Sequence, residues 1–139
     1  MGVFSSLLNV GDITVELYCK FDAPSFDICA VLLDVHADGQ VYGMTQGYQQ
    51  VTVPASPPKL VNAPFKVSVT FQSTCLGIKQ GHKLRLSISG ACYPAYAMNS
   101  GTGSLPGQGD LIDAQVITIE VYASEQYPSK VILPVVNPD

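Results

Sequence analysis

GHKLRLSISG, residues 81–90, is the stretch that indicates the fold most clearly. Leucine and isoleucine alternate here with basic and hydroxyl side chains, and a glycine stands at each end. Because successive side chains of a β-strand point to opposite faces, the alternation predicts a strand with one buried and one hydrated face. The first glycine favours a tight turn into that strand.

The same alternation recurs along much of the chain and predicts further strands over residues 13–18, 65–72 and 117–122. Residues 28–36 are apolar on both faces, which suits a central strand that is covered on both sides. The Asp38-Gly39 pair that follows is a strong hairpin signal, with residues 41–51 as the partner strand.

Two segments are predicted to be loops. Residues 54–64 contain four prolines, and residues 93–109 are rich in glycine. We find no convincing helical stripe. We therefore expect an all-β fold, a two-sheet jelly-roll β-sandwich of the galactose-binding-domain-like kind, forming one domain over residues 1–139.

The composition excludes some functions. Seven basic residues are scattered singly in a chain of net charge −4, so there is no basic footprint for nucleic acid. No apolar run could span a bilayer, and we expect no membrane association. Only 13% of the residues are charged, about half the usual share, which indicates a surface that faces another protein or domain. The other explanation of the low charge is that uncharged polar residues cover the surface of the β-sandwich.

The four cysteines form no CxxC pair and have no histidine at metal-ligand spacing. We expect buried, reduced thiols in a cytoplasmic protein. A bridge between Cys19 and Cys29, which lie in neighbouring predicted strands, is the alternative.

The residues give little sign of independent catalysis. The chain has no G-x-S-x-G nucleophile elbow, and we expect its two histidines, His36 and His82, to fix turns. The glycine-rich stretch 101–109 lacks the lysine and the helix of a phosphate loop. We predict no catalytic residue, no cofactor and no metal. The carboxylates considered for calcium match no EF-hand and are expected to cap turns: Asp22, Asp27, Asp34 and Asp38.

Tyr93, Tyr96 and Tyr127 lie in predicted loops. Aromatic side chains of this kind form the rim of an interface between domains or a platform on which sugars stack. The residues leave both uses open.

Four motifs in order resemble the C-terminal domain of the X-Pro dipeptidyl-peptidase and cocaine-esterase (CocE/NonD) family of serine hydrolases. The first ends in Asp34-Val35 and the Asp38-Gly39 hairpin, and the second is the strand that contains His82 and Arg85. The third is the loop over residues 94–103. The last opens with Pro128-Ser129 and ends in Leu-Pro-Val, and the match covers residues 11–136.

In that family the domain follows an α/β-hydrolase domain that carries a Ser-His-Asp triad, and no triad position falls in the matched region. The resemblance therefore implies a non-catalytic module that stabilises the catalytic domain of the same polypeptide and shapes its substrate entrance. It assigns structural roles to the motif residues Asp34, Asp38, Gly39, His82, Arg85, Pro128 and Ser129. Whether the complete polypeptide cleaves esters or X-Pro peptides stays open.

This chain departs from the family pattern in ways that favour an apolar interface. Residues 45–50 are uncharged, residues 95–98 lack the usual charges, and Tyr127 replaces a common histidine. Two alternatives stay open: a free-standing carbohydrate-binding module, and a separate subunit that docks onto a hydrolase or onto itself as a homo-oligomer.

Overall fold

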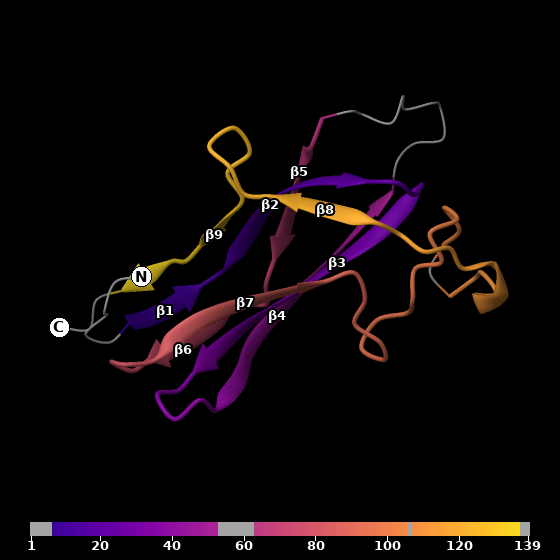
Figure 1. Ribbon diagram of the computed structural model, residues 1–139. Helices are drawn as coiled ribbons and strands as arrows, with labels where there is room; N and C mark the ends of the chain where they lie inside the picture. Colours follow the sequence, from indigo (N-terminus) through magenta and orange to yellow (C-terminus); the bar gives the residue numbers. More distant parts are fainter. Residues whose placement is uncertain (1–6, 53–62, 106, 137–139) are drawn as a thin grey trace.

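The computed structural model describes residues 7–52, 63–105 and 107–136, so residues 54–62 of the predicted proline-rich loop lie outside it. Its elements are strands and one short 3-10 turn, which confirms the all-β prediction (Figure 1). They are β1 (Leu7–Gly11), β2 (Thr14–Phe21), β3 (Ser25–Val35), β4 (Val41–Thr52), β5 (Phe65–Thr70), β6 (Thr74–Ile78), β7 (Lys83–Ser89), η1 (Leu111–Asp113), β8 (Ile119–Tyr122), β9 (Lys130–Ile132) and β10 (Val135–Val136). Within the described ranges, no helix is long and apolar enough to cross a membrane.

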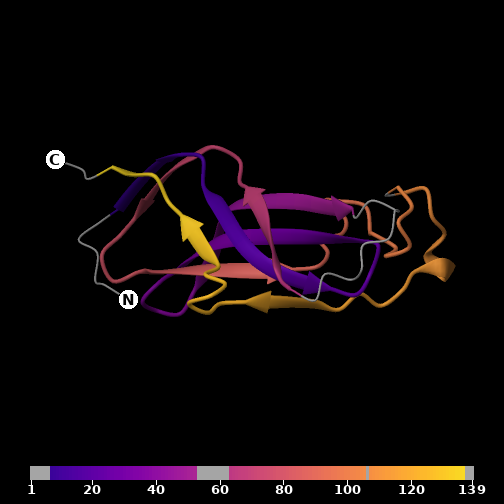
Figure 2. The same cartoon turned by 90° about the horizontal axis from the view of Figure 1, so that it is seen from above.

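The strands form two antiparallel layers (Figures 1 and 2). In one layer β1 and β2 follow each other along the middle, with β6 and β5 on one side and β10, β9 and β8 on the other. In the second layer β3 lies between β4 and β7. This confirms the predicted two-sheet sandwich and the central position of residues 28–35. The jelly-roll order stays a prediction.

The core fills the space between the layers. Every second residue of β2 points inward, as do alternate residues of β3 and β5, because strand side chains alternate between faces. The buried apolar cluster consists of Ile13, Val15, Leu17, Cys19, Phe26, Ile28, Ala30, Leu32, Val67, Val69 and Phe71. Full burial of each large apolar side chain contributes about 1.5–3 kcal/mol. Leu84 and Leu86 of β7 pack against this cluster, which confirms the inward face predicted for them.

β3 is also covered on its outer face. Ser25, Asp27 and Cys29 point away from the core, yet each is at most 2% exposed. The covering comes from the connection between β7 and β8, residues 90–118, which we call the β7–β8 loop. Two of the three residues are polar, so the covering segment must supply hydrogen-bond partners.

β8 is shorter than predicted. It begins at Ile119 instead of residue 117, because the Thr118 amide donates a hydrogen bond to Asp22 Oδ1 (2.8 Å) instead of pairing with a strand. Val121 is 44% exposed, so the predicted burial of its side chain is wrong. β8 pairs with β2 along one edge, and its middle residues, Glu120 and Val121, are exposed.

Candidate functional site

The β7–β8 loop extends from the end of the sandwich opposite β1 and β10 (Figures 1 and 2, orange). Large apolar side chains of this loop are open to solvent, and Ile112 and Val116 are 90% and 94% exposed. We call the set the loop apolar surface: Tyr93, Met98, Leu105, Leu111, Ile112 and Val116. Side chains of this kind usually lie in a core, so a loop that exposes several of them is a candidate interaction surface.

Asn99 attaches this loop to the outer face of β3. Its Oδ1 accepts hydrogen bonds from Ser25 Oγ and from the Gly101 amide, both at 2.9 Å. Its Nδ2 donates to Asp27 Oδ1, also at 2.9 Å. Asn99 thus satisfies two polar groups that are buried in the strand. Its side chain also fixes the course of the loop immediately after it.

Tyr96 adds an aromatic contact to the same attachment. Its ring stacks on that of Tyr48 in β4, with centroids 4.0 Å apart and planes 6° apart. Burial raises the pKa of Tyr48 to about 12, and its hydrogen bond to the Asp27 carboxylate acts in the same direction. Tyr48 therefore stays a neutral hydrogen-bond donor to Asp27 across the physiological range.

The cysteines are all free. Burial raises the pKa of Cys19 to about 11. Burial and then a hydrogen bond with Cys92 of the loop raise the pKa of Cys29 to about 11. Cys19 lies in the core and Cys29 on the outer face of β3, so the alternative of a bridge between them is wrong.

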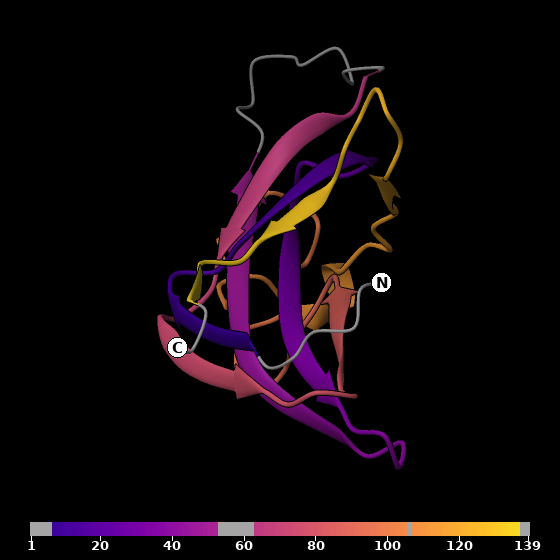
Figure 3. The same cartoon turned by 90° about the vertical axis from the view of Figure 1, so that its left-hand side faces the viewer.

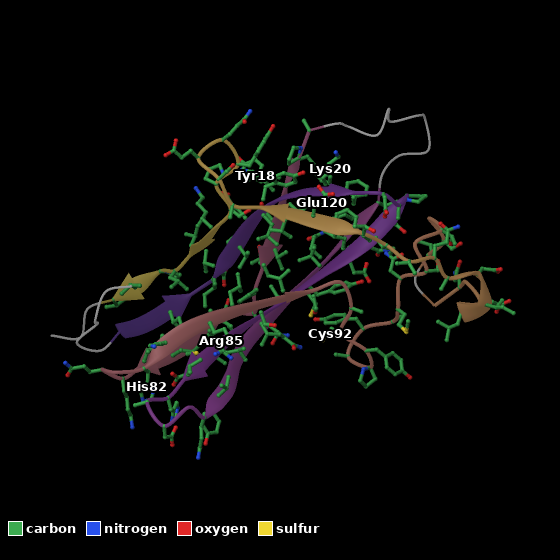
Figure 4. The ribbon with its side chains drawn as sticks, in the orientation of Figure 1. Tyr18, Lys20, His82, Arg85, Cys92 and Glu120 are labelled. Carbon is green, nitrogen blue, oxygen red and sulfur yellow. The ribbon has the colours of Figure 1, made fainter. Side chains whose placement is uncertain are left out.

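The three predicted interface tyrosines do not come together. Tyr93 is 74% exposed and Tyr96 is half-buried in the β7–β8 loop. Tyr127 lies in the turn between β8 and β9, where its ring centroid is 5.8 Å from those of Tyr18 and Tyr122. Figure 4 shows Tyr18 far from Cys92, the neighbour of Tyr93 in the chain.

A second group of polar side chains lies at the β3–β4 hairpin. His82 Nδ1 is 2.9 Å and 3.0 Å from the two carboxylate oxygens of Asp34. His36 Nε2 is 3.3 Å from Asp34 Oδ2. Among the described residues, the polar partner of both imidazoles is this carboxylate, and no serine hydroxyl takes part. The arrangement is therefore not a serine-hydrolase triad.

The expectation that four acidic residues cap turns is confirmed for one of them. Asp38 does so, since its Oδ1 accepts the Gln40 amide (3.0 Å) beside Gly39, whose φ is +88°. Asp22 does not cap its own turn, because its carboxylate accepts the amide of Thr118, just before β8, and that hydrogen bond lowers the pKa of Asp22. For Asp27 and Asp34 the expectation is wrong, because both are strand residues of β3 with side-chain partners.

The remaining motif residues occupy two places. Arg85 is an exposed residue of β7 opposite Leu33. Ser129, after Pro128, joins three strands: its Oγ accepts the Tyr18 amide (2.9 Å) and donates to the Tyr122 carbonyl (2.5 Å) just before β9. The Pro128-Ser129 motif thus connects the β8–β9 turn to β2.

Comparison with known proteins agrees with this picture. Residues 6–132 match the family described as the X-Pro dipeptidyl-peptidase C-terminal non-catalytic domain. The chain is 24% identical over 134 residues to cocaine esterase from Rhodococcus sp. (strain MB1 Bresler), a match that covers 91% of this chain and 23% of the esterase.

Solved structures share the fold. An aminopeptidase from a marine sediment Thaumarchaeota archaeon superposes with a TM-score of 0.82 at 14% identity, over 99% of this chain and 25% of its own. An α-amino acid ester hydrolase gives 0.82 at 21% identity, over 97% of this chain and 24% of its own. The chain thus spans about a quarter of the length of the relatives it matches.

Proposed function

The chain belongs to the family of X-Pro dipeptidyl-peptidase C-terminal non-catalytic domains, and from this premise we propose that it docks onto an α/β-hydrolase domain of the same polypeptide. There it stabilises the catalytic domain and forms part of the wall of the substrate entrance. The reaction belongs to the partner domain, where a serine acyl-enzyme would form and an oxyanion hole would stabilise it. Relatives named as an esterase, an aminopeptidase and an amino acid ester hydrolase favour an acyl-transfer substrate, an ester or a peptide.

The observation that carries this proposal is the loop apolar surface. Ile112 and Val116 are at least nine-tenths exposed, and the protein gains stability when a partner removes such side chains from water. An interface between domains typically buries about 600–1,500 Å², and apolar and aromatic residues dominate its centre. The relatives are about four times longer than this chain, so the natural occupant is the rest of such a polypeptide.

The attachment of the loop supports the same role. Because Asn99 and Tyr96 hold the base of the loop against β3 and β4, less conformational entropy is lost when its outer side chains dock. A loop held in this way can also keep a fixed position beside an active site, as an entrance wall must.

The first test is the size of the native polypeptide, measured in source cells by blotting with an antibody raised to this domain. A band several-fold heavier than 14.8 kDa supports the proposal. A band at 14.8 kDa contradicts docking within one polypeptide and leaves the separate subunit and the free-standing carbohydrate-binding module as explanations.

The second test uses the complete polypeptide that the blot identifies. Ile112→Asp with Val116→Asp places charges on the loop apolar surface and should lower the thermal midpoint and esterase or peptidase activity of the whole protein. The matched control is Val41→Asp, at a residue that is 42% exposed in the hairpin at the other side of the fold. Equal effects of the two changes would contradict docking through this loop.

The carbohydrate-binding alternative has weaker support. Tyr127 lies on the other layer from Tyr93, and one face of Tyr96 is already occupied by Tyr48. These tyrosines therefore do not present one aromatic platform.

A further inference from the structure

Both histidines of the chain meet at one carboxylate, although they are far apart in the sequence. The ligand atoms of Asp34, His36 and His82 all lie within 4.8 Å of one another, and the imidazole centroids are 4.1 Å apart. We propose that these three side chains form a binding site for a divalent transition-metal ion of the zinc class. This inference does not depend on the docking proposal.

The donor set decides the class of ion. Two imidazole nitrogens and one carboxylate oxygen are ligands that Zn²⁺ accepts, and three protein ligands leave a fourth position for water. Calcium and magnesium prefer sites made of oxygen alone, whereas imidazole suits zinc, copper and nickel. Ligands at about 2.0–2.2 Å from a tetrahedral ion lie roughly 3.3–3.6 Å from one another. His36 is already 3.3 Å from Asp34, and the 2.9 Å between His82 and Asp34 needs to lengthen by only a few tenths of an ångström.

The backbone already holds the three residues in place. Asp34 lies near the end of β3, opposite Tyr42 on one side and Leu84 on the other. His36 begins the hairpin turn, in which its amide donates to the Gln40 carbonyl (2.8 Å). The His82 amide donates to the Lys79 carbonyl (3.1 Å) in the turn before β7. Two tight turns and a strand therefore bring the ligands together with no large rearrangement.

The second histidine separates this site from an ordinary structural pair. A hydrogen bond between Asp34 and His82 alone would suffice to join the hairpin to the turn before β7. His36 brings a further nitrogen to the same carboxylate, and its ring is one-third exposed, whereas the other two side chains are about 15% exposed. An ion can therefore reach the site from the side of His36. Figure 3 shows the β3–β4 hairpin extending from the body of the sandwich, and Figure 4 places His82 beside it.

The test is zinc binding by the untagged 139-residue chain after its metal has been removed with a chelator. We titrate Zn²⁺ in competition with a chromogenic chelator and record the visible spectrum with Co²⁺. We expect one ion per chain and a Co²⁺ absorption spectrum typical of a four-coordinate site. His36→Ala should bind the ion at least tenfold more weakly. Cys75→Ser is the matched control, because an exposed thiol is a competing zinc ligand, and it should bind as the original chain does.

His36→Ala is chosen because His36 is the most exposed ligand, and a urea-unfolding curve shows whether the variant folds. An NMR titration of the unaltered chain adds a readout that needs no variant: Zn²⁺ should shift the imidazole nitrogen signals of both histidines together. The proposal is overturned if His36→Ala binds zinc as tightly as the original chain. It is equally overturned if Cys75→Ser abolishes binding, or if zinc leaves both imidazole signals unchanged.

Discussion

Asn99 donates a hydrogen bond of 2.9 Å to the carboxylate of Asp27, a residue that is 2% exposed and 72 positions earlier in the chain. A carboxylate can be buried only if hydrogen bonds replace the water it loses. The loop that carries the proposed docking surface thus also supplies the hydrogen bonds that allow Asp27 to be buried on the outer face of β3. Stability of the sandwich and the position of the loop depend on the same side chain.

Replacing Asn99 with alanine should therefore destabilise the domain. Ser25 and Asp27 would each lose a partner while still buried, which costs about 1–3 kcal/mol, and more where the group is charged. Urea unfolding measures the loss, and limited proteolysis within residues 90–118 reports the release of the loop. Ser104→Ala, at an exposed residue of the same loop, should stay within about 0.5 kcal/mol of the original chain. Equal stability of the two variants would contradict the role given to Asn99.

Gly47 of β4 allows the two layers to approach each other. A Cβ at this position would lie 2.3 Å from Phe71 Cδ1 and 2.9 Å from the Thr70 carbonyl oxygen. Gly47→Ala should therefore destabilise the fold by roughly 1–3 kcal/mol through overpacking. Gly43→Ala is the matched control in the same strand, because nothing lies within 4 Å of its Cβ position. Thermal unfolding of both variants checks the prediction, and a Gly47→Ala midpoint equal to that of Gly43→Ala would disprove it.

Phe26 and Ile112 contrast the core with the docking surface. Phe26 is fully buried, so Phe26→Ala should cost about 3–5 kcal/mol in the isolated chain. Ile112 is 90% exposed, so Ile112→Ala should change the stability of the isolated chain by less than about 0.5 kcal/mol. A large loss on Ile112→Ala in the isolated chain would show that this side chain serves the fold of the domain itself, contrary to the docking role.

The parts of the fold that local patterns encode could be predicted from the sequence. The Asp38-Gly39 turn and the central strand before it are confirmed, and the loop predicted over residues 93–109 lies within the longer connection between β7 and β8. β1, β6 and β10 were not predicted. β6 contains Gly77, and β10 has two residues, too few for a periodic pattern. Residues of this kind adopt strand geometry because neighbouring strands supply hydrogen bonds.

The two polar clusters could not be predicted because they depend on strand order. Asp34 and His82 meet because β3 and β7 pair in a register that sets Asp34 opposite Leu84. The sequence predicts that Asp27 caps a turn, whereas its side chain is buried in β3. The partner that permits its burial, Asn99, comes from a loop distant in the sequence. A list of candidate polar residues can be read from the sequence, but the contacts among them require the register.

The buried thiols predict how stability depends on alkaline pH. Burial raises the pKa of Cys19 from 9.0 to about 11, so between these values the unfolded chain has lost a proton that the native chain keeps. The number of bound protons is then smaller in the unfolded state, and the free energy of unfolding falls as pH rises from 9 to 11. The stabilisation that is fully present below pH 9 and lost by about pH 11 amounts to roughly 2–3 kcal/mol.

Urea unfolding from pH 8 to 11 should show this decline. Cys19→Ala should have lower stability at pH 8 but a shallower decline, whereas the exposed Cys75→Ala should keep the slope of the original chain. A slope that Cys19→Ala leaves unchanged would mean that other groups, such as Tyr48 with its pKa of about 12, dominate the alkaline transition.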